Sequence, residues 1–210
     1  VSKTLTGVAA LALAAFSSPA QADGAPAMWR LADENSEVFL FGTFHVLPAA
    51  IEWTTPAFEA AMQATGVTIT EADVTSPAAS AAMVSLIGKY GMNPPGMTLS
   101  GTLGPARAAE LERVASSLGV PMSMLEGFRP WLALVSLAAI AMQKAGFDAA
   151  SGVEAVVLAR AAEEGDRIKY FETVDDQIRI LASLDDAQML ANFDVTIAQF
   201  DDISALTTRM

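Results

Sequence analysis

The pattern of apolar positions predicts a strand hairpin over residues 28–43. Two short apolar-rich runs, 28–33 and 37–43, are separated by a polar turn. The second run contains four consecutive apolar residues at 38–41, which predicts a strand that is covered on both faces. Further strands are expected at 67–70 and at 168–171, each followed by an acidic residue.

Proline, glycine and capping residues predict where the helices begin and end. Thr55 is expected to cap a helix that has Pro56 in its first position and Phe58, Ala61 and Met62 on its inner face. The other helices are expected over 77–90, 105–118, 131–145, 153–164, 175–184 and 186–200. The helix over 131–145 is apolar nearly all round and is therefore expected to be buried.

The order of these elements predicts an α/β (α+β) fold. A small central sheet would have flanking helices, and a helical insertion would separate the third and fourth strands. We find no repeat and no long linker in the sequence, so residues 23–210 are expected to form one domain. Because the chain ends at Met210 without a further strand, we expect this domain to be incomplete at its C-terminus.

Residues 1–22 are expected to be a signal peptide. Lys3 precedes an apolar run of roughly a dozen residues, and an Ala-x-Ala cleavage pattern ends at Ala22. The run is too short to span a bilayer, and the chain has no Cys to carry a lipid anchor. We therefore expect a periplasmic or secreted protein that is cleaved after Ala22 and has no membrane span in its mature form.

The composition excludes some partners. The formal net charge is −12, and removal of residues 1–22 takes away only Lys3, which leaves 11 basic against 24 acidic residues. Such an acidic chain repels phosphate backbones, so nucleic acid is not an expected partner. A peptide or small-molecule ligand is compatible with this charge, and the sequence does not define the oligomeric state.

His45, the only histidine, is the sharpest candidate for chemistry. It follows Gly42-Thr43-Phe44 at the end of a predicted strand, where ligands bind in open α/β sheets. Gly42 is expected to take a positive φ or to allow a ligand to approach closely. The alternative is a capping or partly buried histidine whose ring is satisfied by a backbone carbonyl.

Carboxylates at the other strand ends are candidate partners of His45. Glu71 follows the strand at 67–70, and Glu172 ends another strand at the same predicted edge. A carboxylate beside an imidazole can ligate a metal, orient the ring or act as a general base. Asp73 is expected to be a turn or cap residue. Arg129 is expected either to bind an anionic group or to form a surface salt bridge.

The absences are also informative. The sequence contains no nucleophile elbow, no Walker loop, no dinucleotide-binding glycine motif and no His-Glu-x-x-His motif. One histidine cannot build a two-histidine zinc site within this chain.

The combination of motifs resembles the TraB/PrgY/GumN family. The resemblance rests on Trp29-Arg30-Leu31, on Val38 to Leu47 with its Gly-Thr-Phe-His, and on Trp53 to Pro56. It continues through Arg129-Pro130-Trp131, Gly152-Val153-Glu154 and Phe171-Glu172-Thr173 with Gln177. This family is similar to the Tiki metalloproteases and, more distantly, to the erythromycin esterase (EreA) and ChaN-like group.

The resemblance implies a metal-dependent, peptidase-like hydrolase. The family's cleft is built from two Gly-x-x-His motifs and a glutamate; here His45 matches the first histidine and Glu71 the acid, and the second motif has no counterpart. His45 and Glu71 are thus the implied catalytic and metal-binding residues, Gly42 and Thr43 belong to the motif, and Arg129 and Glu172 are candidate substrate-binding residues. The implied cofactor is a divalent cation, Mn, Co or Zn. The alternative functions are a non-catalytic binding protein for a peptide, haem or polysaccharide precursor, and a degenerate structural relative.

Overall fold

The computed structural model describes residues 26–183 and 186–207. The predicted signal peptide, residues 1–22, lies outside these residues. The strands are β1 (Met28–Ala32), β2 (Glu37–Phe41), β3 (Leu47–Pro48), β4 (Val67–Thr70), β5 (Phe147–Asp148) and β6 (Arg167–Tyr170). The helices are α1 (Pro56–Ala64), α2 (Pro77–Tyr90), α3 (Leu99–Ser117), α4 (Pro130–Lys144), α5 (Val153–Glu164), α6 (Val174–Ser183) and α7 (Asp186–Thr207), with short 3-10 turns at Met122–Met124 and Ala149–Ser151.

The described strands form three separate pairs, which corrects the expectation of one central sheet. β1 pairs with β2 and β3 pairs with β5, both antiparallel, whereas β4 and β6 are parallel. The mixed α/β class is correct. Strand pairing depends on contacts between distant segments, so the local apolar pattern predicts where strands lie better than which strands join.

β2 is covered on one face only, contrary to the expectation from its apolar run. Val38 and Leu40 are about half exposed, while Phe39 and Phe41 face inward and line a cavity. Phe41 packs against Trp53 and Phe58, with ring centroids 5.8 and 5.1 Å apart. The exposure of Val38 and Leu40 shows that the outer face of β2 is not covered by another layer among the described residues.

The helix boundaries largely follow the sequence signals. The Thr55 hydroxyl accepts a hydrogen bond from the backbone N–H of Phe58, and the Ser76 hydroxyl does the same for Ala79 at the start of α2. Phe58, Ala61 and Met62 are the buried side chains of α1, as predicted. The main difference is α3, which begins at Leu99 and is kinked at Gly104, where φ is 74°.

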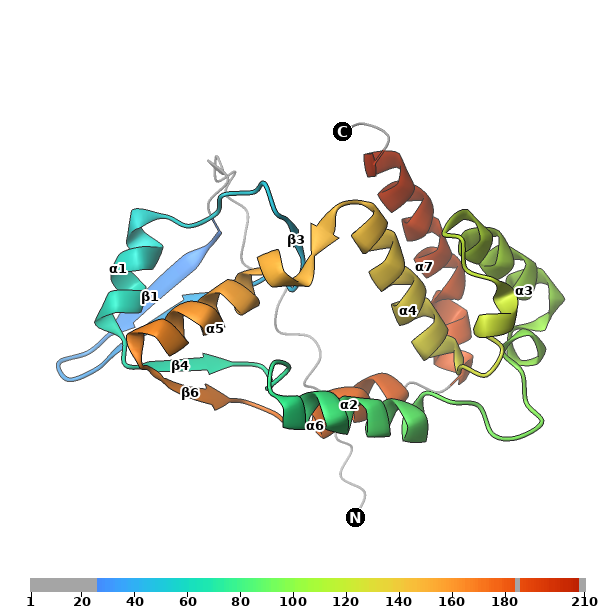
Figure 1. Cartoon of the computed structure of the whole chain (residues 1–210), viewed down its shortest axis with the longest axis horizontal. Helices are drawn as coiled ribbons and strands as arrows, with labels where there is room; N and C mark the ends of the chain where they lie inside the picture. The colour runs from blue at the N-terminus through green and yellow to red at the C-terminus, as the bar shows by residue number, and fades with distance from the viewer. Residues whose placement is uncertain (1–25, 184–185, 208–210) are drawn as a thin grey trace, which may run out of the picture.

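The strand pairs and the helices occupy different ends of the molecule (Figure 1). The hairpin, α1, α5 and the β4–β6 pair lie at one end, α3, α4 and α7 form the other, and α2 and α6 pack side by side between them. Trp131 and Leu132 of α4 are buried together with Val174 and Ile178 of α6, which joins the helical end to this central pair. In the described part of the chain, no helix combines the length and apolar character that a membrane crossing requires.

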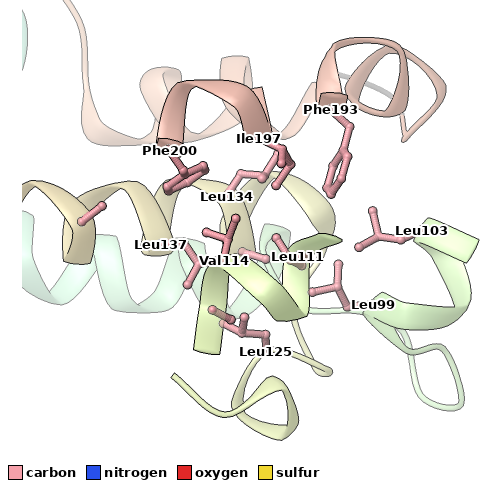
Figure 2. Close-up of a cluster of buried hydrophobic side chains, with 13 residues drawn as sticks. Leu99, Leu103, Leu111, Val114, Leu125, Leu134, Leu137, Phe193, Ile197 and Phe200 are labelled. Carbon is pink, nitrogen blue, oxygen red and sulfur yellow. The ribbon is translucent and has the colours of Figure 1, made fainter. Parts of the chain in front are cut away.

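The largest core cluster lies in the helical end (Figure 2). Phe193 and Ile197 of α7 point toward Leu111 of α3 and Leu134 of α4, and Phe193 is 1% exposed. A smaller cluster around Trp53, Phe58 and Val153 joins α1 to the N-terminal turn of α5. This second cluster supports the segment that carries His45.

Candidate functional site

The His45 turn is fixed against the N-terminus of α5. Directly after the turn, β3 pairs with β5, which precedes α5 in the chain. The backbone N–H of Val153, the first residue of α5, donates a hydrogen bond of 2.8 Å to the carbonyl of Phe44. These two attachments place His45 above the first turn of the helix.

Gly152, and not Gly42, is the glycine that this arrangement requires. A Cβ atom at Gly152 would lie 2.2 Å from the carbonyl oxygen of His45, so the backbone of the turn could not approach a larger residue. A Cβ at Gly42 would meet nothing within 4 Å, and Gly42 is not among the glycines with positive φ. The expectation of a positive φ at Gly42 is therefore wrong. The space beside Gly42 is open, as the expected close approach of a ligand would require.

Glu154 holds the imidazole of His45. The Nδ1 atom lies 2.9 Å from Oε2 of Glu154, whose side chain is only 8% exposed, whereas the His45 side chain is 67% exposed. Glu154 is also in the first turn of α5, where the helix dipole favours a negative charge. With Nδ1–H donating to this carboxylate, Nε2 carries the free lone pair and is presented to the solvent-facing side.

Glu71 lies across from Nε2, as the sequence predicts. Its Oε2 is 3.8 Å from Nε2, and its side chain is 58% exposed. Together with Glu154 and Gln177, His45 and Glu71 line a cleft of about 440 Å³. The structure therefore brings the candidate partners His45 and Glu71 into one cleft.

Glu172 reaches the same sheet edge but faces a different space. Its backbone N–H donates to the carbonyl of Glu71, because β6 runs parallel to β4. Its carboxylate accepts a hydrogen bond of 3.3 Å from Nε2 of Gln177, which lines the cleft. Glu172 itself lines a neighbouring cavity, so it supports the wall of the cleft through Gln177.

Arg129 is not brought to the cleft. It precedes α4, its backbone N–H donates to the Gly91 carbonyl, and its guanidinium donates to the Tyr90 carbonyl at 3.5 Å. It is absent from the residues that line the cleft. The structure thus places Arg129 at the junction of α2 and α4.

Asp73 caps the segment that precedes α2, as predicted. Its carboxylate accepts hydrogen bonds from the backbone N–H groups of Thr75 and Ser76. Hydrogen bonding from Ser76, followed by that from Thr75, lowers the pKa of Asp73. The nearby Tyr170 hydroxyl has a raised pKa, first because of burial and then because of the negative charge of Asp73.

The site offers two direct donors for a metal ion. Among the described residues, no group of three or more histidines, aspartates and glutamates is arranged to hold a cation. Nδ1 of His45 is occupied by Glu154, which leaves Nε2 and the Glu71 carboxylate. An imidazole nitrogen with a carboxylate oxygen suits Mn²⁺, Co²⁺ or Zn²⁺ in kind, and a carboxylate on the remote ring nitrogen is the usual support of a ligating histidine.

Glu154 is the site residue that the sequence analysis did not select. In the sequence analysis it appears only within the Gly152-Val153-Glu154 motif, and an acid near a helix N-terminus is favourable whatever the function. The signal that could have found it is Gly152 directly before that helix, since a glycine there permits another backbone to lie against the helix start.

The fold and the cleft define a mixed α/β domain with an exposed histidine held between two carboxylates. The family model described as TraB/PrgY/gumN family matches residues 27–210. The chain belongs to the TraB/PrgY/gumN family. No curated protein and no solved structure matches it.

Proposed function

We propose that the His45 cleft is the active site of an exported, metal-dependent hydrolase that acts on peptide-like bonds. One observation carries the proposal: a single imidazole lies between two carboxylates from different elements. Glu154 of α5 fixes Nδ1 at 2.9 Å, and Glu71 at the end of β4 faces Nε2 at 3.8 Å. A ring that is oriented on one side and open on the other is suited to binding or to proton transfer.

In this proposal, His45 Nε2 and a Glu71 oxygen hold a divalent cation, Mn²⁺, Co²⁺ or Zn²⁺. Glu154 keeps the ring in the tautomer that leaves Nε2 free to ligate. When bound, the cation supplies Lewis-acid polarisation of a substrate carbonyl and of the attacking water. Among the described side chains, these two would be the direct protein donors to such a cation.

In the proposed reaction, a carboxylate of the chain itself transfers the proton. Glu71 is exposed to the cleft, and its second oxygen can accept a proton from the attacking water and return it to the leaving nitrogen. Glu154 is largely buried, its carboxylate is engaged with Nδ1 of His45, and its proposed role is to position that ring. Glu172 acts on the cleft only through its hydrogen bond with Gln177.

The lining of the cleft favours an uncharged substrate. In the described part of the chain the lining combines two glutamates with apolar side chains such as Val46, Val74 and Leu158, and it includes no Lys or Arg. Apart from the proposed cation, the described side chains offer no countercharge to a phosphate ester or an acidic sugar. A neutral amide bond fits this lining better, which supports the peptide-like class.

The rival proposal is a binding protein that uses the same cleft without chemistry. Two donors hold a divalent cation weakly, and this observation favours the rival. A peptide, haem or polysaccharide precursor would then be the ligand. The erythromycin-esterase and ChaN-like architecture also stays a prediction.

Metal titration and peptide cleavage test the proposal together. Purified protein is titrated with Mn²⁺, Co²⁺ and Zn²⁺ by calorimetry, and each loaded form is incubated with a mixture of uncharged peptides that is followed by mass spectrometry. We expect one metal to bind and to support cleavage. His45→Ala and Glu71→Gln should lose both properties, whereas Glu112→Gln on the exposed surface of α3 should keep both.

Two results would overturn the hydrolase proposal. Equal metal affinity in the wild type and in His45→Ala would remove the metal role of His45. Intact peptides with all three metals, combined with specific peptide binding, would favour the binding protein.

A further inference from the structure

A second cavity adjoins the His45 cleft and shares its two carboxylates. It measures about 310 Å³ and lies between the β1–β2 hairpin, α1, β4 and α5. Glu71 and Glu154 line both spaces, so together they form a common wall. If the reacting bond of a substrate lies beside His45, a substituent next to that bond would therefore lie at the second cavity.

Most of the side chains that line this cavity are apolar, and threonines and the two shared glutamates make up the rest. Its floor includes Phe41, Phe58, Met62 and Val157, and no Lys or Arg is among the described residues that line it. Such a surface favours an apolar group, because each buried apolar area is removed from water. The volume is near the lower end of the roughly 300–1,000 Å³ that is typical of ligand pockets, which suits one large side chain.

Two further observations indicate an occupant rather than a packing defect. At the edge of the cavity, Ile69 is 47% and Phe171 is 76% exposed, so large apolar side chains already face solvent there. Thr70 also lines the cavity, and its hydroxyl oxygen is buried and has no hydrogen-bond partner within the described residues. Buried polar groups are normally paired, so a ligand group is the natural partner for Thr70.

We propose that this cavity receives a large apolar side chain of a peptide substrate, next to the bond that lies at His45 and Glu71. The Thr70 hydroxyl would form a hydrogen bond with the substrate backbone. The inference deepens the proposed function and rests on it for the identity of the bond. The pocket itself can be tested without any turnover.

The first test measures binding of small neutral probes by calorimetry or NMR titration. N-acetyl-phenylalanine amide should bind the wild type roughly tenfold or more tightly than N-acetyl-glycine amide, since the difference is one buried side chain. Thr43→Trp should abolish this preference, because Thr43 is exposed and lines the cavity. Ala50→Trp is the matched control, an exposed loop position outside the lining, and should retain the preference.

A second variant removes the hydroxyl but keeps the shape of the side chain. Thr70→Val should leave the unfolding midpoint unchanged or higher, because an unpaired buried hydroxyl is lost. The same variant should weaken binding of N-acetyl-phenylalanine amide several-fold. A purely structural role for Thr70 would not change probe affinity while stability is retained.

The outcomes separate this inference from the hydrolase proposal. Equal binding of the two amides, or an equal loss in Thr43→Trp and Ala50→Trp, would overturn the side-chain pocket. Tighter binding of hexanamide than of N-acetyl-phenylalanine amide would overturn the peptide assignment in favour of an acyl chain. A retained preference for the phenylalanine probe, with no cleavage under any metal, would support the pocket and reject the hydrolase.

Discussion

At the scale of single residues, Glu154 turns an exposed histidine into an oriented one. An imidazole that is 67% exposed would otherwise be free to rotate, and its two nitrogens would exchange roles. The buried carboxylate selects one tautomer and one ring orientation. This ordering lets Nε2 and Glu71 face each other across a defined gap.

Replacing Glu154 with glutamine should therefore weaken metal binding. The amide keeps the shape and one acceptor but loses the negative charge that orients and polarises His45. We expect metal affinity to fall by about 10–100-fold, the usual effect of losing such a supporting carboxylate. Calorimetric titration of Glu154→Gln beside Glu112→Gln measures it, and equal affinities would contradict the proposed support.

The lowered pKa of Asp73 predicts that the stability of the fold depends on pH. Its pKa is lowered in the folded protein by hydrogen bonds from Ser76 and Thr75. The stabilisation is fully present above the ordinary aspartate pKa of about 4 and is lost as the pH falls through the lowered, folded-state value. Asp73→Asn should thus be less stable than wild type at pH 7, and this difference should shrink at about pH 3. Urea unfolding at both pH values measures the difference, and a constant gap would contradict the assignment.

The sequence could predict the reactive part of the site but not its support. His45 and Glu71 each follow a strand, which marked both as candidate site residues, although their strands β2 and β4 belong to separate pairs in the structure. Glu154 is distant from His45 in the sequence and is not part of a recognisable catalytic motif. Its contact with His45 depends on how the turn packs against α5, which local sequence does not specify.

At the scale of elements, the close approach of the His45 turn to α5 depends on Gly152. The clash at this position would involve backbone atoms of His45, which cannot rotate away as a side chain can. A larger residue must displace the turn, the helix or both.

Gly152→Ala should therefore destabilise the fold by roughly 1–3 kcal/mol, as overpacking does, and should also weaken metal binding because His45 moves from Glu154. Gly42→Ala is the matched control, since its Cβ meets open space and its φ is not positive. That control should remain within about 0.5 kcal/mol of wild type. Chemical unfolding and metal titration of both variants check this, and similar behaviour of the two alanines would argue against the close approach.

The helices were more predictable than the sheets for a physical reason. Thr55-Pro56 and Ser76-Pro77 are local start signals, and the hydroxyl of each capping residue is used as expected. The apolar run at 38–41 contains no local signal that shows whether both faces of the strand are covered. Its exposure depends on whether another layer covers the hairpin, and none of the described elements does so.

At the scale of the whole molecule, the largest hydrophobic core lies in the helical end. Phe193 links α7 to α3 and α4 within the largest core cluster (Figure 2). The candidate site lies at the other end, among the strand pairs and α5.

Phe193→Ala should lower the free energy of unfolding by about 3–5 kcal/mol, because a fully buried aromatic ring is removed. Val195→Ala, on the same helix but 63% exposed, should change it by less than about 0.5 kcal/mol. Denaturant unfolding of both variants tests this assignment, and a small effect at Phe193 would contradict the described core.

The proposed export makes a prediction about the mature N-terminus. When the chain is expressed with its leader in a Gram-negative host, N-terminal sequencing of the periplasmic fraction should begin at Asp23. Ala22→Phe should block cleavage, because the cleavage site needs a small residue. An uncleaved wild-type chain in the cytoplasm would reject the leader assignment.

β5, the strand that pairs with β3 after the His45 turn, follows the core helix α4 closely in the chain. α4 ends at Lys144, and β5 begins at Phe147 and pairs with β3 directly after His45. A shift of α4 along its axis would thus pull on the partner strand of the turn and alter the gap between Nε2 and Glu71. We therefore expect that a ligand which binds the helical end and displaces α4 also changes the geometry of the cleft.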